Sequence, residues 1–226
     1  MGCCFLGTRC AETGGGLMSW LTRFDLDHET ALAERINDSY AWHKKLWEAF
    51  PDVPDANRDF LTRIDATAEG FRIYILSQKE PIKPLWCPEN AWAIKRISEA
   101  FFSNKYFRFD IKANPTKCIP FGNEDEKFKK RGKRYAIVKT DEQKAWIERK
   151  AEQNGFRLLE DYPLQIEQVQ PSHFHKEDHS GFHIGARFLG VLSVIDKEKF
   201  IVAFQTGIGS AKAFGFGMMM LQPVNL

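Results

Sequence analysis

The same order of secondary-structure signals occurs twice along the chain, and this repeat constrains the fold more than any other feature. The first half predicts, in order, a strand at 19–27, a helix at 38–50, strands at 58–66 and 71–78, a helix at 88–102 and a strand at 105–113. Asp38 or Ser39 is a suitable N-cap for the first helix, and Pro51 ends it. The first half therefore reads β-α-β-β-α-β.

The second half gives the same order after a basic stretch. It predicts a strand at 134–139, a helix at 140–155, strands within 156–170 and 181–196, a helix at 197–207 and a strand at 217–224. Thr140 is the expected N-cap of the first of these helices, and Gly155 its C-terminal stop. Two successive β-α-β-β-α-β units predict an α+β protein built from two tandem ferredoxin-like domains, as in RNA-recognition motifs.

The chain divides accordingly into four parts. We expect a disordered leader, an N-terminal domain, a basic linker and a C-terminal domain at 1–17, 18–116, 117–133 and 134–226. A hydrophobic content of 43% supports real cores, and no apolar run approaches the ~20 residues that a membrane helix needs. The five cysteines show no metal-binding spacing and no secretory segment precedes them, so we expect reduced thiols and a cytoplasmic protein.

Net charge is only +2, so a nucleic-acid partner would have to bind a local basic patch. The stretch 127–140 holds seven lysines or arginines and no acidic residue. Such a run is either a phosphate-binding track or a solvated loop, and composition alone leaves both open.

A second feature is the glycine-rich segment "TGIGSAKAFGFGMMMLQP" at 206–223. Its glycines follow a predicted helix and precede a strand, which is the wrong order for a dinucleotide fingerprint, and Lys212 lacks the Gly-Lys-Ser/Thr context of a P-loop. Two alternatives remain: a loop whose backbone N–H groups approach a polyanion, or a packing turn between domains.

The glycine segment resembles the C-terminal loop of the CRISPR repeat-processing endoribonucleases of the CasE type, which act with the type I-E Cascade complex. The resemblance continues in order along the chain, through "WLTRFDLD", "FPDVPDANRDFL", "FRFDIKANPTK", "GKRYAIVKTDEQKAWIERKAEQNGFRLLE" and "FLGVLSVID". It implies two ferredoxin-like domains and an enzyme that cuts the repeat of precursor CRISPR RNA without a metal or other cofactor. It also implies that the processed repeat hairpin and other Cascade subunits remain as partners.

Tyr40 and His43 are the candidate catalytic residues. Their spacing places both on one face of the first turn of the predicted helix, whose N–H groups could receive the scissile phosphate. The family carries a Tyr-x-x-His arrangement at this point, which implies a proton-transfer role for His43 and a role for Tyr40 in orienting the 2′-hydroxyl. The alternative is a core histidine, because His43 shares its face with Leu46 and Trp47.

A catalytic cation is expected as well. Lys44 and Lys45 directly follow His43, and Lys212 lies in the glycine segment; of these we favour Lys45 and Lys212. Some relatives in the family that this chain resembles place a lysine where this chain has Glu48. The rival site is "SHFHKEDHSGFH", whose four histidines suit a metal. We favour an RNA-contacting or solvated loop there, and expect no metal.

Several residues are expected to bind the RNA backbone and shape, because A-form stems are gripped that way. They are Lys129, Lys130, Arg131, Lys133, Arg134, Arg149 and Arg157, together with Gly207, Gly209, Lys212, Gly215 and Gly217 of the loop. Three function classes compete: a metal-independent CRISPR RNA endoribonuclease, a non-catalytic RNA-binding scaffold, and a metallohydrolase that uses the histidine segment. The first is the favoured hypothesis.

Overall fold

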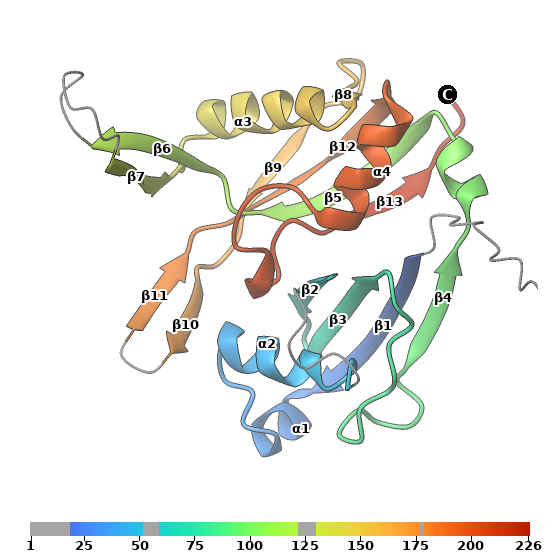
Figure 1. Ribbon diagram of the computed structural model, residues 1–226, viewed down its shortest axis with the longest axis vertical. Coiled ribbons are helices and arrows are strands. Elements are labelled where there is room, and N and C mark those ends of the chain that lie inside the picture. Colours follow the sequence, from blue (N-terminus) through green and yellow to red (C-terminus); the bar gives the residue numbers. More distant parts are fainter. Residues whose placement is uncertain (1–18, 52–58, 122–129, 177–178) are drawn as a thin grey trace, which may run out of the picture.

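The computed structural model describes residues 19–51, 59–121, 130–176 and 179–226. The expected leader at 1–17 lies outside these residues, as does Lys129. Two antiparallel sheets lie one above the other in Figure 1, joined by a single chain crossing after β4. Helix α3 lies above the upper sheet and α1 and α2 lie below the lower one, whereas α4 contacts β2 of the lower sheet.

The first sheet has the order β2-β3-β1-β4, which is the ferredoxin-like arrangement. Its elements are β1 (Ser19–Asp27), α1 (His28–Ala33), α2 (Ser39–Trp47), β2 (Phe60–Ala66), β3 (Gly70–Ser77) and β4 (Ala93–Ile97). The predicted strands, the hairpin and the helix that follows Asp38 are confirmed; the short α1 was not predicted. Phe24, Trp42, Leu46 and Ile75 are all buried in the core that α2 covers.

The expected helix at 88–102 is wrong. Residues Ala93–Ile97 form β4, which pairs antiparallel with β1, and only a 3-10 helix at Glu99–Ser103 follows. Its apolar spacing resembled a helix, but without β4 the edge of β1 would leave its backbone N–H and C=O groups unpaired. Strand pairing satisfies those groups, and local propensity yields to it.

The second sheet has the order β13-β5-β12-β8, again ferredoxin-like, with β9 also pairing with β12. Its elements are β5 (Tyr106–Ala113), α3 (Thr140–Gln153), β8 (Phe156–Leu158), β9 (Gln165–Gln168), β12 (Ala186–Val194), α4 (Lys197–Thr206) and β13 (Met219–Pro223). Two hairpins are added: β6 (Thr116–Phe121) with β7 (Lys130–Ala136), and β10 (Ser172–Lys176) with β11 (His179–His183).

The strand at 105–113 was assigned to the wrong sheet. β5 pairs with β12 and β13, and its Phe107, Phe109 and Ile111 are buried in the second core. The second domain therefore begins between β4 and β5, and the expected boundary at 116/117 is wrong. Residues 117–133 are not a linker in the described part, because β6 and the start of β7 lie there, and β7 replaces the strand expected at 134–139.

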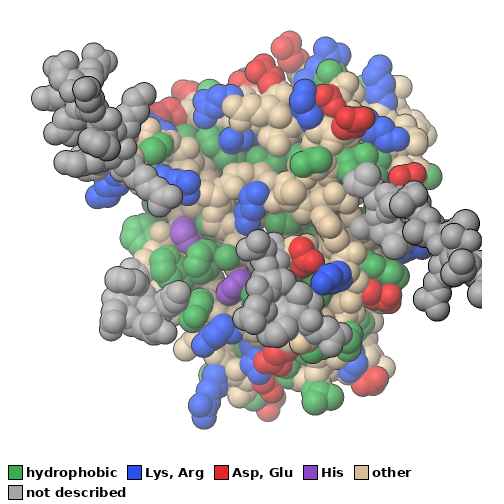
Figure 2. Space-filling view, in the orientation of Figure 1, with side chains coloured by type: hydrophobic (Ala, Val, Ile, Leu, Met, Phe, Trp, Pro, Cys, Tyr) green, Lys and Arg blue, Asp and Glu red, His purple; other side chains and the backbone are tan. Residues whose placement is uncertain are grey.

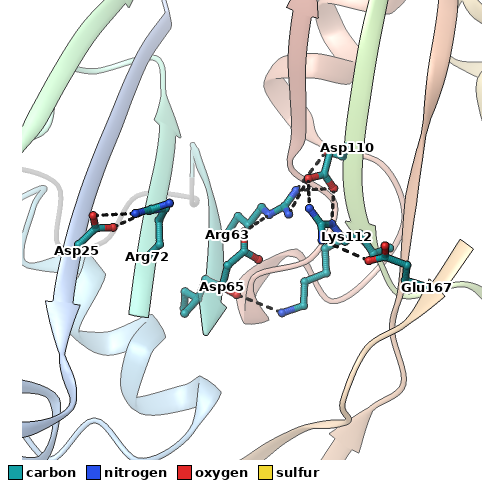
Figure 3. A network of polar contacts seen from close by, with 9 residues as sticks. Asp25, Arg63, Asp65, Arg72, Asp110, Lys112 and Glu167 are labelled. Carbon is teal, nitrogen blue, oxygen red and sulfur yellow. Dashed lines mark hydrogen bonds and ion pairs between the residues drawn. The ribbon is translucent and has the colours of Figure 1, made fainter. Parts of the chain in front are cut away.

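The two domains pack through apolar contacts and a buried ionic network. Leu61, Leu76 and Ile97 of the first sheet belong to the core of the second domain. Arg63 of β2, with a side chain only 3% exposed, pairs with Asp110 of β5 at 2.9 Å (Figure 3). Arg187 pairs with the same carboxylate at 2.8 Å. The shared carboxylate fixes the position of β2 against the second sheet.

Asp110 is held ionised by this network. Burial works against its charge, but hydrogen bonds from Arg187 and Arg63 outweigh that cost and keep the pKa of the carboxyl below its usual value. Lys112 also links the two domains, because its Nζ donates a hydrogen bond to the carbonyl of Ile64 at 3.1 Å. Burial lowers the pKa of this lysine.

Among the described residues, no helix combines the length and apolar character that crossing a membrane would require.

Candidate active site

The N-terminus of α2 is the centre of the candidate site. Asp38 is its N-cap, as predicted, and accepts a hydrogen bond from the amide of Ala41 at 2.7 Å. The amide of Trp42 donates to the Asp38 carbonyl at 3.1 Å. The expectation that this turn offers its N–H groups to a phosphate is therefore wrong for these two amides, because Asp38 already holds them.

Tyr40 and His43 lie on one face of α2, as the spacing predicted. Their ring centroids are 6.5 Å apart with an angle of 29° between the planes, and both side chains are half-buried. The pair lies at the border between the domain core and the surface, since the neighbouring Trp42 and Leu46 are the residues that α2 buries.

His43 is oriented by the next turn of the same helix. Trp47 Nε1 donates to His43 Nε2 at 3.2 Å, and the two rings meet edge to face. A nitrogen that accepts a hydrogen bond carries no proton, so this contact favours the neutral tautomer with hydrogen on Nδ1. Trp47 packs in turn against Phe60 at 5.0 Å, which anchors the imidazole to the core.

The lysines beside His43 differ in their neighbours. Lys45 bonds to Glu34 at 2.7 Å and pairs with Glu48 at 3.3 Å, and the hydrogen bond to Glu34 raises its pKa. Those acidic partners make Lys45 a poor source of positive charge for a substrate. Lys44, the other lysine that directly follows His43, places its Nζ 5.0 Å from the Tyr40 ring.

The glycine-rich loop joins α4 to β13 and descends from the second domain toward α2 and β2 (Figure 1). At its tip the 3-10 helix η2 (Lys212–Phe214) contacts both of those elements. Lys212 therefore belongs to a segment that contacts the first domain beside the helix that holds His43.

The neck of this loop is a packing turn. Gly207, Gly209, Gly215 and Gly217 all have φ between 75° and 91°. The amide of Gly217 donates to Lys112 O at 2.7 Å, and that of Gly207 donates to Ala203 O at 2.8 Å. These two N–H groups are therefore not available to a polyanion, which leaves Gly209 and Gly215 as the backbone positions open to that role.

The hairpin β10–β11, here called the histidine hairpin, forms a third wall of the site. The outer edge of β10 meets the start of α2: His175 N donates to Asp38 Oδ2 at 2.8 Å, and Ser39 Oγ donates to His173 O at 2.7 Å. The His175 ring nitrogen lies 3.3 Å from the same carboxylate. Burial opposes the Asp38 charge, but backbone hydrogen bonds from Ala41 and His175 lower its pKa overall.

The inner face of the histidine hairpin packs on the glycine-rich loop. Phe174 stacks on Phe214 of η2 at 5.0 Å and on His183 at 5.2 Å. His183 contacts Asn114 at 3.3 Å, and burial lowers its pKa. Phe174 and His183 thus support η2 from below, whereas His173 and His175 belong to the other face of β10.

His173 and His183 lie on opposite faces of the histidine hairpin. Within the described part of the chain, no group of three or more His, Cys, Asp or Glu side chains is placed to hold a metal ion. Figure 2 shows histidine side chains beside apolar ones on this face, on the side of the histidine hairpin.

The predicted RNA-binding residues fall in two places. β6–β7, here called the basic hairpin, projects away from α2 near the start of α3 (Figure 1), and its Lys133 and Arg134 are exposed. Lys130 and Arg131 also belong to β7. Arg149 and Arg157 are exposed but lie in the last turns of α3 and in β8, so the 14-residue helix separates them from the basic hairpin by roughly 15–20 Å.

Comparison with known proteins adds an independent line of evidence. Residues 19–223 match the family model described as CRISPR associated protein. The chain is 31% identical to the Cascade subunit CasE of Escherichia coli over 83% of its length and 93% of that protein. It is 27% identical to the endoribonuclease Cse3 of Thermus thermophilus, over 90% of this chain and all of that protein.

A solved structure gives the same answer for the fold. The structure of Thermus thermophilus Cse3 with an RNA representing a pre-cleavage complex superposes with a TM-score of 0.72 at 26% identity, covering 91% of this chain and all of that one. Both ferredoxin-like units are thus accounted for. The chain belongs to the CRISPR associated protein family, and the resemblance to its CasE-type endoribonucleases is confirmed.

Proposed function

We propose that this protein is a metal-independent endoribonuclease that cleaves the repeat of precursor CRISPR RNA and keeps the repeat hairpin within a Cascade complex. The observation that carries the proposal is the Tyr40–His43 pair on α2, walled by η2 of the glycine-rich loop and by the histidine hairpin. The named relatives, a Cascade subunit and a CRISPR endoribonuclease, support the substrate class. We place this activity in the cytoplasm, where precursor RNA is made.

In the proposed reaction, the substrate's own 2′-hydroxyl attacks the adjacent phosphorus. One proton leaves the 2′-oxygen, one reaches the departing 5′-oxygen, and the products carry a 2′,3′-cyclic phosphate and a 5′-hydroxyl. His43 serves as general acid or base, since imidazole titrates near neutral pH. Tyr40 orients the 2′-hydroxyl or assists its deprotonation.

The extra negative charge of the phosphorane requires a nearby cation. Lys212 on η2 and Lys44 above Tyr40 are our choices, and Lys45 is set aside because of its two acidic neighbours. The Asp38 carboxylate at the start of α2 repels phosphate, so we place the phosphate on the Tyr40–His43 side of the helix.

A second candidate is a non-catalytic RNA-binding scaffold. The observation that favours it is the Trp47–His43 hydrogen bond, since a satisfied half-buried histidine can have a purely structural role. The scaffold predicts tight repeat binding without strand scission.

Incubating the full chain with a repeat hairpin of its host genome, with and without excess EDTA, separates these functions. We expect cleavage at one position in both conditions. Binding without cleavage would support the scaffold, and cleavage restored only by added metal would support a metallohydrolase and contradict our proposal.

A further inference from the structure

Phe182 is an unusual phenylalanine in this protein. Of the phenylalanine side chains that the structure describes, it is the one among the exposed large apolar residues, at 58% exposure, whereas residues such as Phe24 and Phe188 are fully buried. A single exposed apolar side chain is ordinary by itself. What distinguishes Phe182 is a second exposed ring beside it and its position close to the candidate catalytic helix.

Phe182 lies opposite His173 across the histidine hairpin. The two rings are cross-strand partners 6.0 Å apart, inclined at 42°, and His173 is exposed as well. Side chains alternate between the faces of a strand, so the buried Phe174–His183 stack belongs to the opposite face. The hairpin is thus packed on one face and presents two flat rings to solvent on the other.

The two rings are held beside the candidate catalytic helix. The carbonyl of His173 accepts the Ser39 hydroxyl at 2.7 Å, and Ser39 immediately precedes Tyr40. The amide of His175 donates to Asp38, which caps the same helix. Because these bonds fix the backbone on either side of Phe174, the exposed face cannot shift far from Tyr40 and His43.

We infer that His173 and Phe182 form a stacking surface for one unpaired nucleobase next to the cleaved bond. The inference rests on the proposed function and adds a substrate subsite to it. Unpaired RNA bases are bound by stacking on Phe, Tyr, Trp or His rings, and base–aromatic stacking tolerates any sequence. Two rings are far smaller than the ~800 Å² per partner of a stable protein interface, which favours a nucleotide over a protein as the occupant.

The test uses a repeat hairpin with a 2′-deoxy sugar at the cleavage position, so that it binds without being cut. 2-Aminopurine, whose fluorescence falls on stacking, replaces each unpaired base flanking the scissile bond in turn. We expect quenching at one position with the wild-type protein. Phe182→Ala should abolish it and raise Kd by about 5- to 150-fold, with an unchanged salt slope, because a stacked base loses no phosphate contact.

Phe182→Tyr should retain quenching. Phe182→Leu keeps the apolar bulk but has no aromatic ring, so it should lose quenching, and it replaces the alanine variant if that variant folds poorly. Val202→Ala, at a residue of α4 that is 57% exposed, is the matched control and should change nothing. Unchanged quenching and Kd in both Phe182→Ala and Phe182→Leu would overturn the inference. So would a loss of Cascade assembly with intact RNA binding, which would make the surface a protein contact. Failure of the wild type to cut all-ribose RNA would instead contradict the proposed function.

Discussion

The two hairpins that extend from the second domain are held by different neighbours. The histidine hairpin is bonded to Asp38 and Ser39 at the start of α2 and packs on the glycine-rich loop through Phe174. The basic hairpin is attached to its own domain, where Lys117 of β6 pairs with Glu142 of α3 at 2.8 Å. One hairpin therefore shapes the candidate active site, and the other offers charge at a distance from it. Chemistry and the salt-dependent part of RNA affinity should accordingly be separable by mutation.

The largest expected effect is on cleavage, from mutation of His43 on α2, the helix to which the histidine hairpin is bonded. His43→Ala should lower single-turnover cleavage by two orders of magnitude or more, because general acid–base catalysis contributes about 10²–10⁴-fold. Repeat binding should remain within about twofold, measured by filter binding at fixed salt. Near-normal cleavage would remove the catalytic assignment of His43.

The second-largest expected effect is a loss of stability when the ionic network between the domains is broken. Asp110→Asn leaves the buried Arg63 with only Asp65 as an ionic partner, and removing one member of a buried pair costs about 3–5 kcal/mol of unfolding free energy. Asp25→Asn is the matched control. Asp25 pairs with Arg72 (Figure 3) and with Arg23 but is about half exposed, and such surface pairs contribute roughly 0–1 kcal/mol. Urea titration of both variants gives the comparison, and equal losses would contradict it.

The Asp110 contribution should also depend on pH in a defined direction. Its folded pKa lies below the unfolded value of about 3.9, so the stabilisation is complete above that value and is lost as the pH falls through the folded pKa. The stability gap between wild type and Asp110→Asn should stay constant from about pH 8 to 5 and shrink below pH 4. If the stability difference between wild type and Asp110→Asn grew in acid, the pH dependence would have the opposite sign and Asp110 would not be held ionised by the network.

A smaller effect is expected where the histidine hairpin meets α2. Asp38→Ala removes both the helix cap, worth roughly 1 kcal/mol, and the bond to His175, so we expect about a tenfold fall in cleavage and faster hydrogen exchange at the His175 amide. Asp27→Ala is the matched control, because Asp27 caps α1 through Thr30 and contacts no part of the hairpin in the described bonds. If both variants slow cleavage equally, the tether has no specific role.

The smallest single effects belong to the basic hairpin. Lys133→Ala and Arg134→Ala should each raise Kd roughly fivefold and reduce the slope of log Kd against log salt by about one, with the cut position unchanged. Arg157→Ala is a useful contrast, because Arg157 lies in β8 beyond the far end of α3, among residues that include Glu148 and Glu152. A larger effect at Arg157 than at Arg134 would place the RNA stem on the other end of the domain.

Much of the fold was predictable because its signals are local. Strand alternation at 19–27, the cap at Asp38 and the helices that begin near Thr140 and Lys197 follow from neighbouring residues, and the structure confirms them. The single strands expected within 156–170 and 181–196 are wrong in detail, because these segments contain β8 and β9, and β11 and β12, and β10 and β11 form a separate hairpin. The sheet to which 105–113 belongs was not predictable, since an alternating strand fits any open sheet position. The false helix at 88–102 has the same origin: its pairing with β1 involves residues about 75 positions away.

In the candidate site, too, contacts between near neighbours in sequence could be predicted and contacts between distant residues could not. Tyr40 and His43 are three residues apart, so helical geometry alone brings them together. The bond between Asp38 and His175 joins residues 137 positions apart, and no periodicity encodes such a contact. Lys44 and Lys45 were indistinguishable by sequence until the positions of Glu34 and Glu48 separated them.

The most direct test of the central claim is the chemistry of the cut ends, determined on repeat RNA cleaved by the full chain in excess EDTA. Attack by the substrate's own sugar predicts a 2′,3′-cyclic phosphate on the upstream fragment and a 5′-hydroxyl on the downstream one. A 3′-hydroxyl with a 5′-phosphate would mean that water attacked, and would contradict the account.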